Sequence, residues 1–489
     1  MRVHLIGICG TGMATLAAML KRKGLDVAGS DQDVYPPMSD FLAAEGIPTL
    51  AGYRADHITG DYDLVVIGNA ISRGNPELEE VLDRKIRHCS LPEAIREHFL
   101  WGARSIVIAG THGKTTTTAL TGWVLTHGGV DPSVLMGGIG LNFGERGSSY
   151  RLGQGRDFVI EGDEYDSAFF DKTAKFLKYL PDLAVVNNVE FDHADIYADF
   201  DAVTLAFRRL VNLVPRRGLL IVGADSPGAR ALAAAAPSRV ESFGLGEDVD
   251  WQAHNLHPAG AMMSFEVRRH GSAFGHFEVP LLGAHNVRNA LAAIAVATEV
   301  GIGVERIAEG LGRFAGIKRR LEVVGTAAGV TIYDDFAHHP TAVGETLAGL
   351  RASHPEARIW AVFEPRSASS CRRVFQNDFA RAFAAADQVL VAPVFRSKLA
   401  EAERLSVPQL VRDLQTRGQT AREGGAIDDM VGLIAREHRP GDLVVCMSNG
   451  TFGGIHQKLL RALERLRPEG GAGGKRGGAE PPSANERQP

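Results

Sequence analysis

The chain has 489 residues, of which 45% are hydrophobic and 23% are charged, which is material for about three globular domains. This composition excludes a single small binding module and a wholly disordered chain. Lys and Arg total 53 against 58 Asp and Glu, a net charge of −5, so no global positive field favours nucleic acid or an anionic membrane surface as a partner.

The first hundred residues predict strands that alternate with helices. Residues 2–6 form an apolar strand that ends in a glycine turn, after which apolar residues recur at helical spacing. Further apolar runs at residues 25–28 and 64–67 predict two more strands. Because strands alternating with helices are typical of a parallel sheet, we expect an α/β domain at residues 1–102.

A second α/β unit begins with an apolar strand at residues 105–109. Two further buried strands are expected at residues 158–160 and 183–186. The region 240–280 alternates polar with apolar residues, which predicts antiparallel strands added to the same domain. We assign residues 103–315 to this unit.

The pattern restarts near Gly316 and predicts a third α/β domain, residues 316–466. Its expected strands lie at residues 331–333, 359–363, 389–392 and 443–446, and helices are expected at residues 340–350 and 374–385. After residue 467 the composition narrows to Gly, Pro and charged residues, which cannot bury enough apolar surface to fold. Residues 467–489 are therefore predicted to be a disordered tail.

Cysteine usage and hydropathy predict the compartment. Cys9, Cys89, Cys371 and Cys446 form no C-x-x-C pair, which argues against a zinc knuckle or a disulfide framework. No apolar run of about 18 residues could cross a bilayer, and the glycine turn follows Met1 too closely for a signal peptide. We expect a cytoplasmic protein without membrane or nucleic-acid partners.

The first glycine turn could hold a diphosphate, because backbone N–H groups and a helix N-terminus meet there. The residues expected to contact a ligand are Gly7, Gly10, Thr11 and Gly12. Asp31, at the end of the next strand, is placed for a ribose or base contact. The spacing G-x-x-G-x-G differs from the dinucleotide pattern G-x-G-x-x-G, so a tight turn without a ligand is an alternative.

The second glycine turn indicates a nucleotide phosphate site. Its residues are Gly110, Thr111, His112, Gly113, Lys114, Thr115 and Thr116. The turn supplies glycine amides, a cation at Lys114 and a metal-binding hydroxyl at Thr115, which together suit a phosphate chain. It is two residues shorter than the usual G-x-x-x-x-G-K-[ST].

Acidic residues follow two later strands of the same domain. The first group is Glu161, Asp163 and Glu164, and the second is Glu190, Asp192 and His193. Ligands of open α/β sheets bind at the carboxyl ends of strands, and carboxylate oxygens suit Mg²⁺. The acids could instead cap helices, and His193 could be a structural histidine as well as a metal ligand.

Three further groups follow in the chain. Asn286 and Asn289 lie three residues apart on one helix face and could contact an adenine edge or cap the helix. Arg320 belongs to a basic cluster that is either solvated or, at a domain junction, a clamp on phosphate, and Asp335 ends a strand. An NAD-dependent oxidoreductase would leave Lys114 unexplained, and a P-loop switch protein would leave the first turn unexplained.

Together these residues resemble the Mur ligases, ATP-dependent enzymes of bacterial cell-wall synthesis, over residues 1–466. The resemblance implies a Rossmann-like N-terminal domain for a UDP-sugar, a central domain with a P-loop ATPase-type parallel sheet, and a Rossmann-like C-terminal domain that brings an amine. It also implies that ATP phosphorylates a substrate carboxylate and that the amine attacks the acyl phosphate. Such chemistry needs charge neutralisation and positioning rather than an enzyme nucleophile.

The resemblance implies roles for single residues. Lys114 would hold the β- and γ-phosphates of ATP, while Thr115 and Glu161 would bind one Mg²⁺. His193 would serve a second Mg²⁺, although several Mur ligases also use a carbamylated lysine and residues 199–214 contain no lysine.

The remaining implied contacts complete the nucleotide site and define the substrate sites. Asn286 and Asn289 would lie near the adenine, and Arg320 and Asp335 would reach ATP when the domains close. The substrate contacts implied are Gly7, Gly10, Thr11, Gly12, Asp31, Asn69, Ser72, Arg366, Ser448 and Asn449.

Within the family, residues 35–39, 69–76 and 364–367 resemble the member that joins a murein tripeptide to UDP-N-acetylmuramate during peptidoglycan recycling. That tripeptide is L-alanyl-γ-D-glutamyl-meso-diaminopimelate. The alternative is the member that adds L-alanine to the same UDP-sugar.

Overall fold

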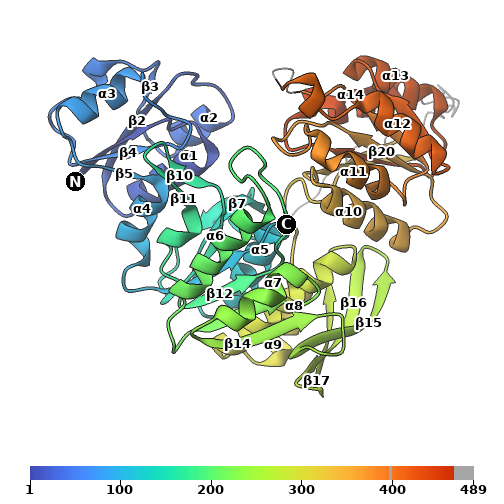
Figure 1. Ribbon diagram of the computed structural model, residues 1–489, viewed down its shortest axis with the longest axis horizontal. Helices are drawn as coiled ribbons and strands as arrows, with labels where there is room; N and C mark the ends of the chain where they lie inside the picture. Colours follow the sequence, from blue (N-terminus) through green and yellow to red (C-terminus); the bar gives the residue numbers. More distant parts are fainter. Residues whose placement is uncertain (396–398, 467–489) are drawn as a thin grey trace, which may run out of the picture.

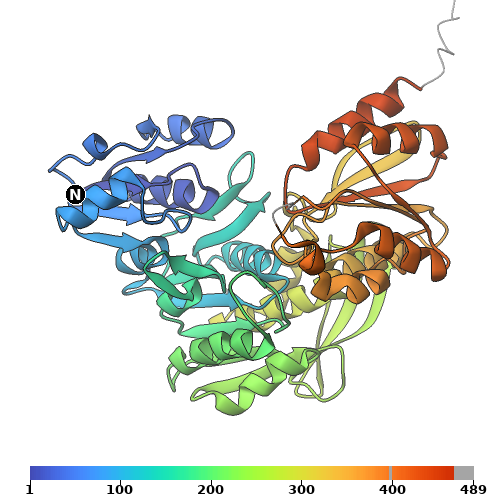
Figure 2. The same cartoon turned by 45° about the horizontal axis from the view of Figure 1, so that its top comes forward.

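The computed structural model describes residues 1–395 and 399–466, so the predicted tail, residues 467–489, lies outside the described residues. The described chain forms three α/β lobes, coloured blue, cyan through green to yellow, and gold to red (Figure 1). The N-terminal and C-terminal lobes lie on different sides of the central lobe in both views (Figure 2). The predicted three-domain α/β class is confirmed.

The N-terminal lobe is built on a five-stranded sheet in which every strand pair is parallel. Its order is β3 (Thr49–Ala51), β2 (Asp26–Asp31), β1 (Arg2–Ile6), β4 (Leu64–Ile67) and β5 (His88–Ser90). Its helices are α1 (Thr11–Arg22), α2 (Met38–Ala44), α3 (Pro76–Asp83) and α4 (Leu91–Ile95). The predicted second strand runs three residues further than expected, to Asp31, which places that carboxylate beside the glycine turn.

The central lobe has a ten-stranded sheet with antiparallel strands at both edges. Its order is β17 (Ser272–Val279), β16 (Met262–Arg269), β15 (Trp251–Ala259), β14 (Arg239–Gly244), β13 (Leu219–Gly223), β12 (Leu183–Val186), β6 (Arg104–Ala109), β9 (Asp157–Gly162), β7 (Ser133–Gly140) and β8 (Ser148–Arg151). A separate hairpin pairs β10 (Asp166–Ala168) with β11 (Asp171–Ala174). The antiparallel strands expected in the region 240–280 are confirmed as β15 to β17.

Helices of the central lobe hold the second glycine turn, residues 110–116, against the sheet; this turn is called the phosphate turn below. They are α5 (Lys114–His127), α6 (Phe200–Leu213), α7 (Pro227–Leu232), α8 (Ala284–Val300) and α9 (Val304–Gly312). Leu120 and Val124 of α5 and Leu291 and Ile294 of α8 are completely buried in one core on the same face of the sheet. Since β6 lies between β12 and β9, the turn before α5 lies between the ends of the two strands that carry the acidic groups.

The C-terminal lobe has a six-stranded sheet that is parallel except for its first strand. Its order is β18 (Glu322–Ala327), β19 (Val330–Asp335), β23 (Leu443–Met447), β20 (Ile359–Phe363), β21 (Gln388–Val391) and β22 (Thr420–Glu423). Its helices are α10 (Pro340–Ser353), α11 (Gln376–Ala382), α12 (Val407–Thr416), α13 (Ile427–Glu437) and α14 (Ile455–Glu464).

The helix predicted at residues 374–385 is wrong in extent. A 3-10 turn occupies Arg373–Phe375, and α11 then ends at Ala382. Phe383 lies beyond the helix but is completely buried, and its ring centroid lies 5.6 Å from that of Phe363. The apolar pattern therefore continues past the helix because the chain after it still packs into the core.

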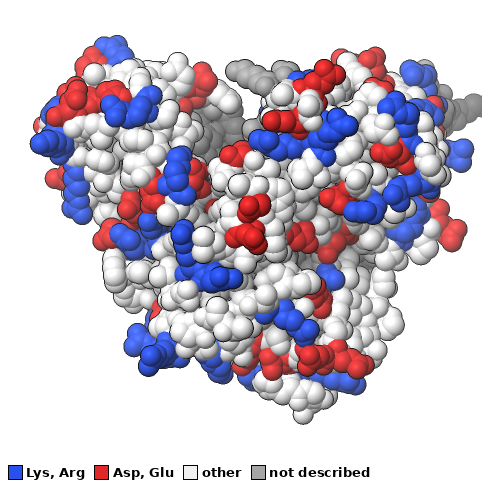
Figure 3. Space-filling view, viewed as in Figure 1, with Lys and Arg blue, Asp and Glu red and all other residues white. Residues whose placement is uncertain are grey.

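The visible surface carries both signs of charge, interspersed across all three lobes (Figure 3). Among residues 1–395 and 399–466, no helix is long and apolar enough to span a membrane.

One continuous apolar core joins α1 and β1 of the N-terminal lobe to α6 and β12 of the central lobe, so these two lobes share buried surface.

Candidate active site

The turn between β6 and α5 needs glycine for two separate reasons. Gly113 has φ +79°, in the left-handed region that side chains rarely adopt. A Cβ atom at Gly113 would also lie only 2.4 Å from Asn289 Oδ1 of α8. Gly110 has φ +135°, and a Cβ there would lie 3.0 Å from the backbone nitrogen of Asn187. The turn can therefore bring backbone N–H groups close to a ligand at the N-terminus of α5.

Lys114 is held inside this turn by a buried acid. Its Nζ donates to the carbonyl oxygens of Gly110 and Thr111 at 2.8 and 3.1 Å and lies 2.8 Å from Glu164 Oε2. Burial alone would lower the pKa of Lys114, but Glu164 and Asp163 outweigh it and raise the pKa. The ammonium group therefore stays charged, and its predicted contact with phosphate stays a prediction.

Thr115 and Glu161 converge as their predicted metal role requires. Thr115 Oγ1 donates to Glu161 Oε1 at 3.0 Å, and the backbone N–H of Gly137 donates to Glu161 Oε2 at 2.6 Å. Burial raises the pKa of Glu161, while the Gly137 N–H and Lys114 oppose that shift. Two hard oxygen donors in this arrangement fit a Mg²⁺ ion.

Glu164 is a central residue of the site, although it was predicted only as one member of an acidic group. Its Oε1 lies 2.7 Å from His193 Nε2 as well as 2.9 Å from Lys114 Nζ, and its side chain is 1% exposed. Burial would lower the pKa of His193, but Glu164 and Asp192 raise it. His193 is thus an ion-pair partner of Glu164 in this state, and its metal role stays a prediction.

The predicted adenine-side residues lie within the first turns of α8, after the N-cap residue Gly283. Asn289 Nδ2 donates to Asn286 Oδ1 at 3.1 Å, and Thr117 Oγ1 donates to Asn289 Oδ1 at 3.2 Å. The Nδ1 atom of His285 in the same turn is buried and has no hydrogen-bond partner. A bound base could supply the missing partner of this nitrogen.

Arg320 and Asp335 lie near this turn of α8. Burial lowers the pKa of His285, and the charges of Asp335 and Arg320 also act on it. Asp335 is 4% exposed and accepts from the backbone N–H groups of Leu321 and Ala337 at 2.7 and 2.8 Å. Arg320 lies over the ring of Phe336 at 5.3 Å.

Arg319, which the sequence did not single out, fastens the segment before β18 to the loop after β23. Its guanidinium donates to the carbonyl oxygens of Ser448 and Gly450, both at 2.6 Å. The neighbouring Arg320 makes neither of these bonds, and its charge acts on His285 of the central lobe. Its contact with ATP stays a prediction.

In the N-terminal lobe, Asp31 fastens the first glycine turn. Its carboxylate accepts from the backbone N–H of Cys9 at 2.8 Å and from the Tyr53 hydroxyl at 3.2 Å. Asn69 donates to Asp166 of β10 in the central lobe at 3.0 Å, and its Oδ1 is buried without a partner. Gly10, Thr11, Gly12 and Ser72 are exposed.

In the C-terminal lobe, the predicted substrate residues meet at the ends of β20 and β23. Ser448 Oγ donates to Glu364 Oε2 at 2.5 Å, and Arg366 lies 3.6 Å from Glu364 Oε1 and stacks over Phe395. The Oδ1 atom of Asn449 is buried without a partner. The Arg366 guanidinium can donate to a carboxylate, whereas the free Asn449 Oδ1 can only accept a hydrogen bond, for example from an N–H group.

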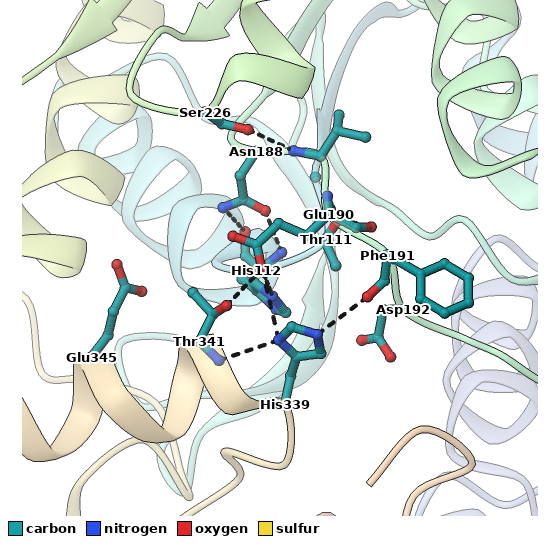
Figure 4. Close-up of polar contacts among 12 residues, drawn as sticks. Thr111, His112, Asn188, Glu190, Phe191, Asp192, Ser226, His339, Thr341 and Glu345 are labelled. Atoms are coloured by element: carbon teal, nitrogen blue, oxygen red, sulfur yellow. Dashed lines mark hydrogen bonds and ion pairs between the residues drawn. The ribbon is translucent and has the colours of Figure 1, made fainter. Parts of the chain in front are cut away.

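The central and C-terminal lobes meet through the loop after β12 (Figure 4). Thr341 of α10 donates to Glu190 Oε2 at 2.6 Å, and His112 Nε2 lies 3.2 Å from the same oxygen. Burial alone would raise the pKa of Glu190, but His112 and Thr341 outweigh it and lower this pKa to about 2. The phosphate turn, the acidic loop and the first turn of α10 are thus joined at one carboxylate.

Three stretches of the chain match the domains of one family. They are the Mur ligase family catalytic domain at residues 2–100, the Mur ligase middle domain at residues 108–297 and the Mur ligase glutamate ligase domain at residues 319–450. The chain therefore belongs to the Mur ligase family, whose members are ATP-dependent ligases that form C–N bonds.

Individual relatives narrow the comparison within that family. One relative is the UDP-N-acetylmuramate–L-alanyl-γ-D-glutamyl-meso-2,6-diaminoheptandioate ligase of Escherichia coli. The two sequences are 40% identical in an alignment that covers 95% of this chain and 99% of that enzyme. A second relative is the UDP-N-acetylmuramate–L-alanine ligase of Salinibacter ruber, which is 35% identical in an alignment that covers 95% of each chain. The crystal structure of a murein peptide ligase from Psychrobacter arcticus matches with a TM-score of 0.70 and 35% identity, covering 95% of this chain and 99% of that one.

Proposed function

We propose that this protein is a ligase that uses ATP to join L-alanyl-γ-D-glutamyl-meso-diaminopimelate to UDP-N-acetylmuramate, in the recycling of peptidoglycan. The observation that carries the proposal is the full-length similarity to the Escherichia coli enzyme named for that reaction, at 40% identity over 95% of this chain. Both substrates are soluble small molecules, and we place the protein in the cytoplasm. We also keep the domain boundaries at residues 102/103 and 315/316, which fall between the three sheets.

In this proposal the central lobe holds Mg²⁺-ATP at the turn before α5. Bound ATP supplies the phosphoryl group that activates the muramate carboxylate, with phosphate leaving when the peptide amine forms the amide. Lys114 would neutralise charge on the transferring phosphate once a phosphate replaces Glu164 as its partner. Thr115 and Glu161, already 3.0 Å apart, would hold one Mg²⁺.

The adenosine end would lie along the first turns of α8. The buried, unpaired Nδ1 atom of His285 and the Asn286–Asn289 pair offer polar groups for a base. Arg320 and Asp335 would reach the nucleotide from the C-terminal lobe, since both act electrostatically on His285. His193 would serve a second Mg²⁺ after release from Glu164.

The two outer lobes would hold the two substrates to be joined. In the N-terminal lobe, the exposed glycine turn beside Asp31 would bind the UDP diphosphate, with Asn69 and Ser72 nearby in the chain. In the C-terminal lobe, Arg366, Ser448 and Asn449 would bind a carboxylate of the tripeptide. A tripeptide with several carboxylates needs more such donors than alanine does.

The L-alanine ligase is the second candidate, because a relative with that name is 35% identical over 95% of this chain. The test of the proposed reaction is ATP-dependent phosphate release with UDP-N-acetylmuramate and the tripeptide, with the product identified by mass. We expect equal amounts of phosphate and UDP-N-acetylmuramoyl-tripeptide, and no turnover when either substrate is omitted. Phosphate release without the UDP-sugar would contradict the proposal.

A further inference from the structure

Three metal-binding side chains converge where the central and C-terminal lobes meet (Figure 4). Ligand atoms of His112, Glu190 and His339 all lie within 4.8 Å of one another. His112 Nε2 lies 3.2 Å and His339 Nδ1 lies 3.8 Å from the same oxygen, Glu190 Oε2. Four-coordinate Zn²⁺ with bonds of about 2.0–2.1 Å holds its ligand atoms about 3.3 Å apart, so small side-chain shifts would form such a site.

The three residues come from separate parts of the fold. His112 belongs to the phosphate turn, Glu190 to the loop after β12, and His339 is the N-cap of α10 in the C-terminal lobe. Their side chains are 14%, 36% and 6% exposed, respectively. An ion at this position would therefore be partly shielded from water and would hold two lobes together.

The surroundings of His339 are those of a metal ligand. Its Nε2 lies 3.2 Å from the backbone carbonyl oxygen of Phe191. Its Nδ1 lies 3.8 Å from Glu190 Oε2 and accepts from the backbone N–H of Thr341 at 3.3 Å, a long capping bond that an ion at Nδ1 would replace. Metal-binding histidines typically donate their second ring N–H to a carbonyl or carboxylate, and that contact fixes the ring. The Thr341 hydroxyl donates to Glu190 Oε2 itself at 2.6 Å and so holds this oxygen beside the two imidazoles.

A cavity gives access to this cluster from solvent. Its volume is about 500 Å³, and its walls include Glu190, His339 and Thr341 together with Phe375 and Arg381. Because the cavity opens between the two lobes, an ion could enter without unfolding either of them.

We propose that His112, Glu190 and His339 bind a divalent transition-metal ion of the Zn²⁺ type, which ties the C-terminal lobe to the phosphate turn. Two imidazoles and one carboxylate favour Zn²⁺ and similar ions, whereas Mg²⁺ prefers oxygen ligands. The site shares no residue with Thr115 and Glu161, the pair proposed for Mg²⁺. It is thus a second class of metal site in the same molecule.

A second His–Glu–His group in the N-terminal lobe provides an internal control. His4 lies 3.3 Å from Glu77 Oε2, and His57 lies 2.7 Å from the other oxygen, Oε1. The two imidazoles therefore face different oxygens of a carboxylate that is itself fully buried. In the described part of the chain, only the His112 cluster brings three ligand atoms within 4.8 Å of one another. The second group has the same three residue types without this geometry, so we expect it not to bind the ion.

The experiment is a titration of the full, chelator-treated chain with Co²⁺, a spectroscopic stand-in for Zn²⁺, in excess Mg²⁺ and without ATP or substrates. We expect one Co²⁺ per chain, visible d–d bands without a thiolate charge-transfer band, and displacement by one Zn²⁺ but not by Mg²⁺. Glu190→Gln and His339→Asn should each weaken binding about 100-fold or more, since even outer contacts of such sites contribute 10–100-fold. His57→Asn should bind like the unmodified protein.

Several outcomes would overturn the proposal. They are the absence of stoichiometric Co²⁺ or Zn²⁺ binding, a thiolate band, loss of binding in His57→Asn, or unchanged affinity in Glu190→Gln. Glu190→Gln decides the matter if His339→Asn does not fold, because the amide keeps the size of the side chain and an acceptor for Thr341. None of these measurements uses ATP, so their result is independent of the proposed reaction.

Discussion

Replacing Lys114 by alanine should have two separable effects, one on the ligand-free protein and one on the reaction. In the ligand-free state Lys114 Nζ lies 2.8 Å from a Glu164 carboxylate that is 1% exposed. Removing one partner of a buried ion pair destabilises a protein by roughly 3–5 kcal/mol, although His193, 2.7 Å from Glu164 Oε1, still compensates part of the remaining charge. Because Lys114 keeps 13% exposure, we expect the lower end, about 3 kcal/mol, in denaturant unfolding.

The effect on the reaction comes from lost charge neutralisation at the transferring phosphate. Removing a single preorganised donor to a developing charge typically costs about 3 kcal/mol, which corresponds to roughly 150-fold in rate. The assay is steady-state phosphate release at saturating ATP, UDP-N-acetylmuramate and tripeptide, under conditions where Lys114→Ala is still folded.

A double variant separates the two effects. Lys114→Met with Glu164→Gln removes both charges and leaves no unpaired carboxylate, so it should recover most of the lost stability without recovering activity. Near-normal turnover of Lys114→Ala would refute the assignment of Lys114 to the phosphate chain. A double variant as unstable as Lys114→Ala would refute the importance of the buried pair.

Three other predictions address the surroundings of this site. Gly113→Ala should destabilise the fold by about 1–2 kcal/mol from its left-handed φ and weaken ATP binding through the close approach to Asn289; an unchanged urea midpoint would contradict this. The pKa of Glu190 lies at about 2 rather than 4.5, so its contribution to stability should be complete above about pH 4.5 and be lost as the pH falls towards 2. In Glu190→Gln, the free energy of unfolding should fall less between pH 4.5 and pH 2 than it does in the unmodified protein. The same fall in both proteins would refute the prediction. Since residues 199–214 contain no lysine, activity should survive removal of bicarbonate; loss and rescue by bicarbonate would point to a carbamylated lysine elsewhere.

The nucleotide side of the site could be predicted from sequence because parallel sheets bring strand ends together. Thr115 and Glu161 meet as expected, since β6 and β9 are adjacent strands. The role of Glu164 could not be separated from that of its acidic neighbours, because Glu161 still lies inside β9 whereas Glu164 lies beyond it. Only the conformation of that loop decides which acid meets Lys114.

The contacts between the central and C-terminal lobes could not be predicted from the sequence. Glu190 and Thr341 are 151 positions apart, and no periodicity links the end of a strand in one domain to the start of a helix in another. The basic cluster poses the same problem, since Arg319 rather than Arg320 bonds the carbonyl oxygens after β23. Adjacent arginines have equal composition and charge, and only the positive φ values of the turn at Arg319 and Leu321 separate their directions.

The proposed reaction is tested most directly by competition between the two amines. The protein is supplied with ATP, UDP-N-acetylmuramate and equal concentrations of L-alanine and L-alanyl-γ-D-glutamyl-meso-diaminopimelate, and the two products are quantified by mass during initial turnover. Their ratio equals the ratio of kcat/KM for the two amines. We expect the UDP-N-acetylmuramoyl-tripeptide to dominate. A higher yield of UDP-N-acetylmuramoyl-L-alanine would contradict the account and assign the chain to the alanine-adding ligases.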